Sequence, residues 1–121
     1  MPNNHFISLP AAAAMTALYR EERENILATS YKNQNILPLS ETFDRAIIDA
    51  ILGQEGCTGF RIYYGMSEDY LVHAILVGVN EDNEDILPSI NSLLEATDIV
   101  GEQSVRCPED CPPPSPLNET S

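Results

Sequence analysis

Apolar side chains near the start of the chain recur at the spacing of an amphipathic helix. Between residues 9 and 29 they follow one another at steps of three and four, as in Ala11, Met15, Leu18 and Ile26. Ser8 stands just before this stretch, and its hydroxyl can accept a hydrogen bond from a free amide of the first turn. We therefore predict a helix over residues 9–29 that begins at Ser8.

A second helix is predicted after Ser40. Its hydroxyl can cap the helix, and the Glu41 carboxylate suits the positive end of the helix dipole. The apolar face then holds Phe43, Ile47, Ala50 and Ile51. Gly53 and Gly56 end the helix, because glycine is common just past a helix C-terminus.

The pattern changes from helical to alternating in the middle of the chain. Residues 59–65 point alternately to two faces, with Phe60, Ile62 and Tyr64 on one and Arg61 and Tyr63 on the other. Residues 70–79 are apolar apart from His73 and rich in valine and isoleucine, as in a strand covered on both faces. Residues 65–69 have the length of a hairpin loop, so we predict an antiparallel hairpin.

The remaining segments extend this hairpin. Residues 80–85 form an acidic turn that reverses the chain, Ser89 can cap a short helix, and residues 98–106 can add a third strand. Residues 107–121 hold five of the nine prolines and are predicted to form a flexible, extended tail. We expect a single α+β domain over residues 1–106, with the two helices packed on a small antiparallel sheet.

Length and charge set limits on function. The chain has 121 residues, 43% of them apolar, and a formal net charge of -13. One domain with a core fits this composition, whereas binding to nucleic acid or an anionic membrane needs clustered cations. Much of the acidity lies in two turns, Glu68-Asp69 and residues 81–85, at opposite ends of the second predicted strand. The acidity is therefore more typical of two solubilising turns than of one docking patch.

The cysteines and the N-terminus bear on compartment. Three cysteines are an odd number, and no basic segment precedes an apolar one at the N-terminus. We therefore expect a cytoplasmic protein with reduced thiols. A disulfide between Cys107 and Cys111 is possible only in an oxidising compartment.

Two sets of residues could support thiol or metal chemistry. Cys107 and Cys111 have the spacing of half a zinc site, but no second close pair completes it. Cys57 and His73 are the one cysteine and histidine near the predicted sheet, although each is more typical of a packed residue there. The acidic run 81–85 lacks the glycine and glutamate positions of an EF-hand. We predict no metal site, no cofactor and no catalytic residue.

Aromatic and basic side chains lie together on the first predicted strand. Tyr63 and Tyr64 occupy adjacent positions and point to opposite faces, so at least one can be exposed beside Arg61. Tyrosine and arginine are enriched where proteins bind one another. Arg61, Tyr63 and Tyr64 are therefore candidate partner-binding residues, and packing under a helix is the alternative.

Four segments together resemble a family of short, uncharacterised bacterial proteins. They are residues 35–43, 61–66, 75–79 and 106–118, the last being the Arg-Cys-Pro-Glu-Asp-Cys-Pro-Pro-Pro-Ser-Pro-Leu-Asn tail. The resemblance implies a bacterial source and brings no activity, cofactor or catalytic residue. It draws attention to Cys107 and Cys111, because a partner can bind a proline-rich segment in an aromatic groove.

These observations favour a small acidic interaction protein of the adaptor or inhibitor type, with a protein partner and neither nucleic acid nor membrane. A thiol-dependent enzyme or redox protein that uses Cys57 with His73, or Cys107 with Cys111, is the alternative. A thiol with a lowered pKa would favour the alternative.

Overall fold

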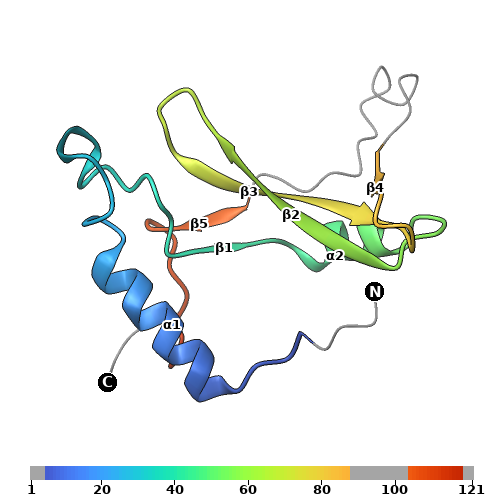
Figure 1. Ribbon diagram of the computed structural model, residues 1–121, viewed down its shortest axis with the longest axis horizontal. Helices are drawn as coiled ribbons and strands as arrows, with labels where there is room; N and C mark the ends of the chain where they lie inside the picture. The colour runs from blue at the N-terminus through green and yellow to red at the C-terminus, as the bar shows by residue number, and fades with distance from the viewer. Residues whose placement is uncertain (1–4, 88–103, 119–121) are drawn as a thin grey trace.

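The computed structural model describes residues 5–87 and 104–118. Within this part of the chain, helices and antiparallel sheets make an α+β fold, as predicted (Figure 1). The predicted helix after Ser89 and most of the predicted strand over residues 98–106 lie outside the described residues.

The predicted hairpin forms the centre of the molecule. Strand β2 (Gly59–Met66) pairs antiparallel with β3 (Val72–Val79), from Gly59 opposite Val79 to Met66 opposite Val72. Strand β4 (Asp85–Ile86) pairs with the end of β3, so the sheet order is β2-β3-β4. The acidic turn between β3 and β4 reverses the chain as predicted. Strand β3 begins at Val72 and not at Tyr70, whose φ of 69° belongs to the hairpin loop.

A second, two-stranded sheet corrects the prediction that Ser40 caps a helix. Strand β1 (Ser40–Thr42) pairs with β5 (Val105–Cys107), a partner far away in the sequence that no local pattern reveals. Helix α2 therefore begins later and spans Arg45–Leu52, with Gly53 at its C-cap. Part of the predicted strand over residues 98–106 thus exists, but it joins β1 and not the hairpin.

Helix α1 begins as predicted and ends early. It spans Leu9–Glu22, and the Ser8 hydroxyl accepts a hydrogen bond from the Ala11 amide at 3.1 Å. The chain then folds back, and the Glu24 carboxylate accepts a hydrogen bond from the Asn33 amide across this turn at 2.7 Å. A short 3-10 helix, Thr29–Tyr31, begins at the residue where the predicted helix ends. The sequence predicts that this helix packs on the sheet. In the structure no residue of α1 is buried, so the helix does not contribute to the core.

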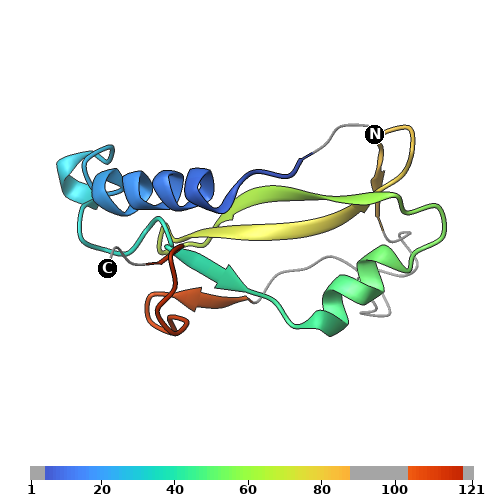
Figure 2. The ribbon, with the colours of Figure 1, turned by 90° about the horizontal axis from the view of Figure 1, so that it is seen from below.

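The second sheet and helix α2 lie on one side of the hairpin (Figure 2). Helix α1 is displaced from the hairpin (Figure 1), and its Tyr19 hydroxyl donates to the Pro38 carbonyl in the segment before β1. The buried apolar residues of the described chain are Ile36, Ile51, Leu76, Val77, Val79 and Cys107. Helix α2 approaches β3 closely at Gly78, where an added Cβ would lie 3.3 Å from Ile51 and 3.0 Å from the Cys57 sulfur.

The predicted boundary between domain and tail falls inside β5. Cys107 is only 2% exposed, and its carbonyl accepts a hydrogen bond from the Leu39 amide at 2.7 Å. Further along, the Arg20 guanidinium of α1 donates to the Leu117 carbonyl at 2.9 Å. The predicted tail is therefore attached to the fold at both Cys107 and Leu117.

Candidate protein-binding edge

The hydrogen bonds of β3 show which of its amides point away from β2. The Val72 amide donates to the Ile36 carbonyl at 2.8 Å, and the Ala74 amide donates to the Glu41 carboxylate at 2.7 Å. Both acceptors lie outside the hairpin. Val72 and Ala74 therefore belong to pairs that do not exchange hydrogen bonds with β2.

The same alternation fixes the direction of the amides in β2. Tyr64 and Met66 are the register partners of Ala74 and Val72, so their amide and carbonyl groups also point away from the hairpin. Every second residue of the strand shares this direction. The outer edge of β2 thus presents the backbone groups of Phe60, Ile62, Tyr64 and Met66.

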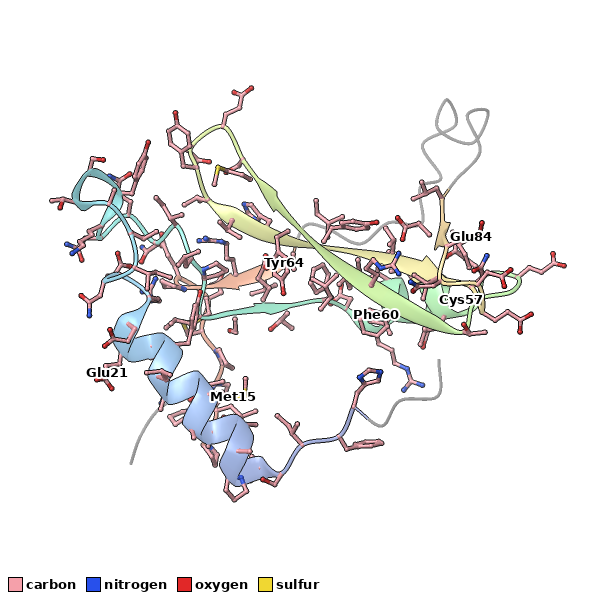
Figure 3. All side chains as sticks on the ribbon, in the orientation of Figure 1. Met15, Glu21, Cys57, Phe60, Tyr64 and Glu84 are labelled. Atoms are coloured by element: carbon pink, nitrogen blue, oxygen red, sulfur yellow. A yellow bond between two sulfur atoms is a disulfide. The ribbon has the colours of Figure 1, made fainter. Side chains whose placement is uncertain are left out.

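The side chains of these four residues are exposed as well. Their exposed fractions are 47% for Phe60, 46% for Ile62, 78% for Tyr64 and 61% for Met66. Among the residues that the structure describes, β2 pairs only with β3, so no strand covers its outer side. We call this row of outward backbone groups and exposed apolar side chains the β2 edge; Phe60 and Tyr64 are labelled along it in Figure 3.

Two open grooves lie on the face of the sheet that carries these side chains. One, of about 430 Å³, lies towards α2 and is lined by Phe60, Ile62, Tyr64, Phe43, Ile48 and Leu76, with Glu41 and Ala74. The other, of about 390 Å³, lies on the other side of Tyr64 and is lined by Tyr19, Leu37, Pro38 and Val72, with Ser40 and Glu41. Tyr64 therefore stands between two apolar depressions.

Acidic turns lie at both ends of the β2–β3 hairpin. Beyond Met66, the hairpin loop carries Glu68 and Asp69, and the Ser67 hydroxyl lowers the pKa of Asp69 through a hydrogen bond. At the Gly59 end, the turn between β3 and β4 carries the exposed residues 81–84. The two turns are separated by the length of β2, roughly 25 Å at 3.3 Å per residue.

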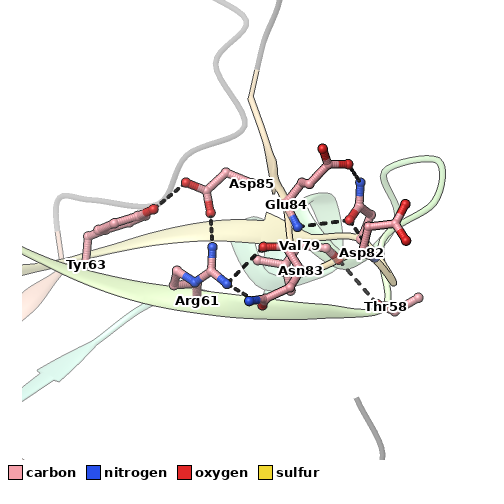
Figure 4. Close-up of polar contacts among 9 residues, drawn as sticks. Thr58, Arg61, Tyr63, Val79, Asp82, Asn83, Glu84 and Asp85 are labelled. Carbon is pink, nitrogen blue, oxygen red and sulfur yellow. Dashed lines mark hydrogen bonds and ion pairs between the residues drawn. The ribbon is translucent and has the colours of Figure 1, made fainter.

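Arg61 and Tyr63, two of the predicted partner-binding residues, bind within the protein. On the face opposite Tyr64, the Arg61 guanidinium contacts the Asp85 carboxylate at 2.5 Å and also donates to Asn83 (Figure 4). The Tyr63 hydroxyl donates to the other Asp85 oxygen. The neighbouring Tyr63 and Asp85 side chains, in that order, raise the pKa of Arg61. These hydrogen bonds fasten β4 to β2, which leaves Tyr64 as the predicted residue on the open edge.

The outer edge of β3 is closed by two long side chains from the other sheet. Glu41 accepts from the Ala74 amide and from the Ser104 hydroxyl at 2.6 Å, and lies 3.6 Å from His73 Nδ1. Its register partner Arg106 donates to the Val72 carbonyl at 3.3 Å. From the sequence, Glu41 is expected at a helix start and Arg106 has no assigned role, because no local pattern shows that both side chains reach β3.

Arg106 also fixes the segment that completes this closure. It donates to the Asn35 and Ile36 carbonyls, each at 2.7 Å. The Ile36 carbonyl is the acceptor of the Val72 amide. The edge of β3 is thus held by a network in which one guanidinium serves three carbonyls.

Cys57 and His73, the predicted nucleophile and base, are not brought together. Cys57 donates to the Gly59 carbonyl at 3.1 Å, at one end of the hairpin. His73 lies opposite Gly65, six residue pairs further along the ladder, a separation of roughly 20 Å at 3.3 Å per residue. The arrangement cannot support proton transfer between the two side chains.

Cys107 and Cys111 form a disulfide, so the expectation of reduced thiols is wrong for this pair, while Cys57 is a free thiol. Within the described residues, no three histidine, cysteine or acidic side chains gather as a metal site. Those residues also contain no helix with the length and apolar character of a membrane span. Structural disulfides persist mainly in oxidising compartments, so the cytoplasmic location remains a prediction that the disulfide does not favour.

No family model, curated protein or solved structure matches the chain. The resemblance to a bacterial family therefore remains a prediction. The function has to be inferred from the geometry of the molecule, in which the β2 edge is the largest continuous row of exposed apolar side chains on the described sheets.

Proposed function

We propose that this protein is a non-enzymatic interaction protein of the adaptor or inhibitor type, and that it binds a protein partner through the β2 edge. The observation that carries the proposal is the coincidence of four outward backbone positions with four exposed apolar side chains on one strand. Exposed strand edges bind other strands readily, and proteins generally shield them. A contiguous apolar surface on a small acidic protein marks a site of association.

A pull-down from the native cell tests this proposal. The wild-type chain is compared with the variant Ile62→Ser/Tyr64→Ser, and with Met15→Ser as the matched control, since Met15 on α1 is 67% exposed. We expect wild type and M15S to recover the same stoichiometric partner, and the edge variant to lose it. Recovery of that partner by the edge variant, or of no partner by any chain, would contradict the proposal.

The alternative is a redox protein that uses Cys107 and Cys111. One observation favours it: the disulfide joins the buried Cys107 to Cys111, which is exposed and open to attack by a thiol. A redox protein would reduce a model disulfide catalytically in the presence of a thiol reductant, and Cys111→Ser would abolish that turnover. A rate equal to that of free dithiothreitol would rule the alternative out.

The cytoplasmic location belongs to the same proposal and is tested by the state of the cysteines in cells. Rapid alkylation before lysis would label Cys107 and Cys111 if the protein resides in a reducing compartment. Recovery of both unlabelled, as the disulfide, would place the protein in an oxidising one.

A further inference from the structure

We propose that the β2 edge takes up an extended segment of its partner as an added β-strand, and that this segment is basic at both ends and apolar at alternate positions between them. This inference rests on the proposed function. It adds the manner of binding and the chemistry of the partner.

The backbone of β2 is suited to strand addition. Eight residues make an extended strand whose inner side is fully paired to β3, from Gly59 to Met66. Its outer side presents an amide and a carbonyl at every second residue, which is the pattern that an antiparallel or parallel strand requires. Main-chain hydrogen bonds supply affinity in such complexes, and alternate side chains supply specificity.

The side chains of β2 select the apolar positions of the segment. In a sheet, neighbouring strands share their faces, so every second residue of an added strand lies beside Phe60, Ile62 and Tyr64. That face carries the groove towards α2, whose lining is mostly apolar. Side chains such as valine or isoleucine at alternate positions would cover this row and continue the apolar surface.

The charges select the ends of the segment. Strand β2 contains no acidic residue, whereas Glu68 and Asp69 follow one end and residues 81–84 lie at the other. The hairpin loop adjoins β2, so one end of an added strand lies beside Glu68 and Asp69, whereas at the other end residues 81–84 follow β3, one strand further away. Lysine or arginine at both ends of the segment would complement these turns, and the net charge of -13 attracts a basic partner over a longer range.

The same charges disfavour a second copy of this chain as the occupant. Antiparallel pairing of two β2 strands would bring the hairpin loop of one copy, with Glu68 and Asp69, beside the 81–84 turn of the other. Parallel pairing would bring identical acidic turns together. Both arrangements place like charges side by side at each end of the new pair, which is destabilising.

A synthetic segment tests the chemistry of the partner. The probe is a blocked ten-residue peptide, Lys-Lys-Val-Thr-Val-Thr-Val-Thr-Lys-Lys, and its control replaces each lysine by glutamate. We expect the lysine peptide to bind the wild-type protein at least about tenfold more tightly in low salt and to weaken steeply with added salt, as screened charges do. Equal binding of both peptides, or of neither, would overturn the inference.

Two substitutions at one position test strand addition itself. Ile62→Pro removes an outward amide that β3 does not use, whereas Ile62→Ala keeps that amide and shortens the side chain. We expect I62P to weaken binding of the lysine peptide at least about tenfold, and I62A to weaken it about threefold or less, since each missing hydrogen bond to a strand also misaligns its neighbours. Circular dichroism and urea unfolding establish that both variants are folded. A smaller loss for I62P than for I62A would show that the peptide does not pair with the backbone.

The failure of this inference is distinguishable from the failure of the proposed function. A cellular partner that is lost with I62S/Y64S and retained with I62P would leave the β2 edge as a binding site and exclude strand addition. Sedimentation of the wild-type chain as a dimer that I62P dissociates would identify the occupant as a second copy and overturn the basic segment.

Discussion

The two outer edges of the β2–β3 hairpin differ in whether their backbone groups have hydrogen-bond partners. On the β3 side, the Val72 and Ala74 amides both have acceptors, and Arg106 binds the Val72 carbonyl. On the β2 side, four residues present backbone groups and exposed apolar side chains, and no described strand pairs with them. One hairpin therefore has a closed edge and an open edge.

The difference shows what closing an edge requires. The groups that close β3 come from β1, from β5 and from the segment before β1, so they depend on the pairing of Glu41 with Arg106 in the second sheet. Proteins commonly shield edges with charged side chains or covering segments. Such groups are present at β3 and absent from β2 in the described residues, which supports the proposal that the β2 edge binds a partner.

The largest effect is expected from removing the group that closes the β3 edge. Arg106→Ala removes a donor from three carbonyls, those of Val72, Asn35 and Ile36, of which Ile36 keeps the Val72 amide. Hydrogen bonds to charged groups each contribute about 1.5 to 3 kcal/mol, and the three are not additive, so we expect a loss of about 3 kcal/mol in the free energy of unfolding. Urea denaturation measures it.

Arg45→Ala is the matched control, because Arg45 is 90% exposed and forms an ion pair with Asp49 on the same helix. We expect that substitution to change the free energy of unfolding by less than about 0.5 kcal/mol. Equal losses in R106A and R45A would mean that the network at the β3 edge does not hold the fold.

Proline substitutions compare the two edges directly. Ala74→Pro and Ile62→Pro each remove one outward amide, but only that of Ala74 is bonded, to the Glu41 carboxylate. We expect A74P to lose about 2 to 3 kcal/mol in the free energy of unfolding, because the Glu41 oxygen that accepts from Ala74 loses that donor, and I62P to lose less than about 1 kcal/mol. The ratio of the two losses, measured in urea, would be near one if both edges were closed.

The disulfide is expected to support the closed edge from the end of β5. Cys107 and Cys111 are 4 residues apart, and closing so short a loop restricts the unfolded chain by about 2 kcal/mol. Cys111→Ser should therefore lose about that amount, and dithiothreitol should destabilise the wild-type protein and leave C111S unchanged. A reductant effect of the same size on both proteins would rule out this role.

A smaller effect is expected from Tyr19, which helps to hold the segment leading into β1. Its hydroxyl donates to the Pro38 carbonyl at 2.7 Å, and burial raises its pKa, an effect that Arg23 partly offsets. A raised pKa in the folded state means that this stabilisation is fully present below the ordinary value, near pH 10, and is lost as the pH rises through the raised value.

At pH 8 we expect Tyr19→Phe to be about 1 kcal/mol less stable than wild type in urea, the contribution of one hydrogen bond. The difference should shrink above pH 10 as the wild-type phenol ionises. A difference that stays constant between pH 8 and pH 11 would contradict the pKa shift of Tyr19.

The local parts of the fold could be predicted from the sequence. Alternation over residues 59–65 and the valine-rich stretch up to Val79 give the hairpin, and Ser8 and Gly53 mark two helix ends correctly, because each signal lies within a few residues of the element it defines. Of the predicted partner-binding residues, Tyr64 lies on the open edge.

The distant parts could not be predicted. Ser40 and Glu41 have the composition of a helix start, and only the pairing with residues 105–107 makes them a strand. Which side of the hairpin is open depends on where Glu41 and Arg106 lie, and periodicity carries no information on that. The spacing of Cys107 and Cys111 permits a disulfide, but the expected location in the reducing cytoplasm disfavours one.

Amide hydrogen exchange along β2, followed by NMR in the unbound protein, tests the difference between the two edges most directly. We expect alternation: the Arg61, Tyr63 and Gly65 amides, which point to β3, exchange slowly, and the Ile62 and Tyr64 amides exchange at least about a hundredfold faster. The Val72 and Ala74 amides on the closed edge should be slow. Protection of Ile62 and Tyr64 equal to that of Arg61 and Tyr63 would show that the β2 edge is covered, and would contradict the open edge on which the proposed function rests.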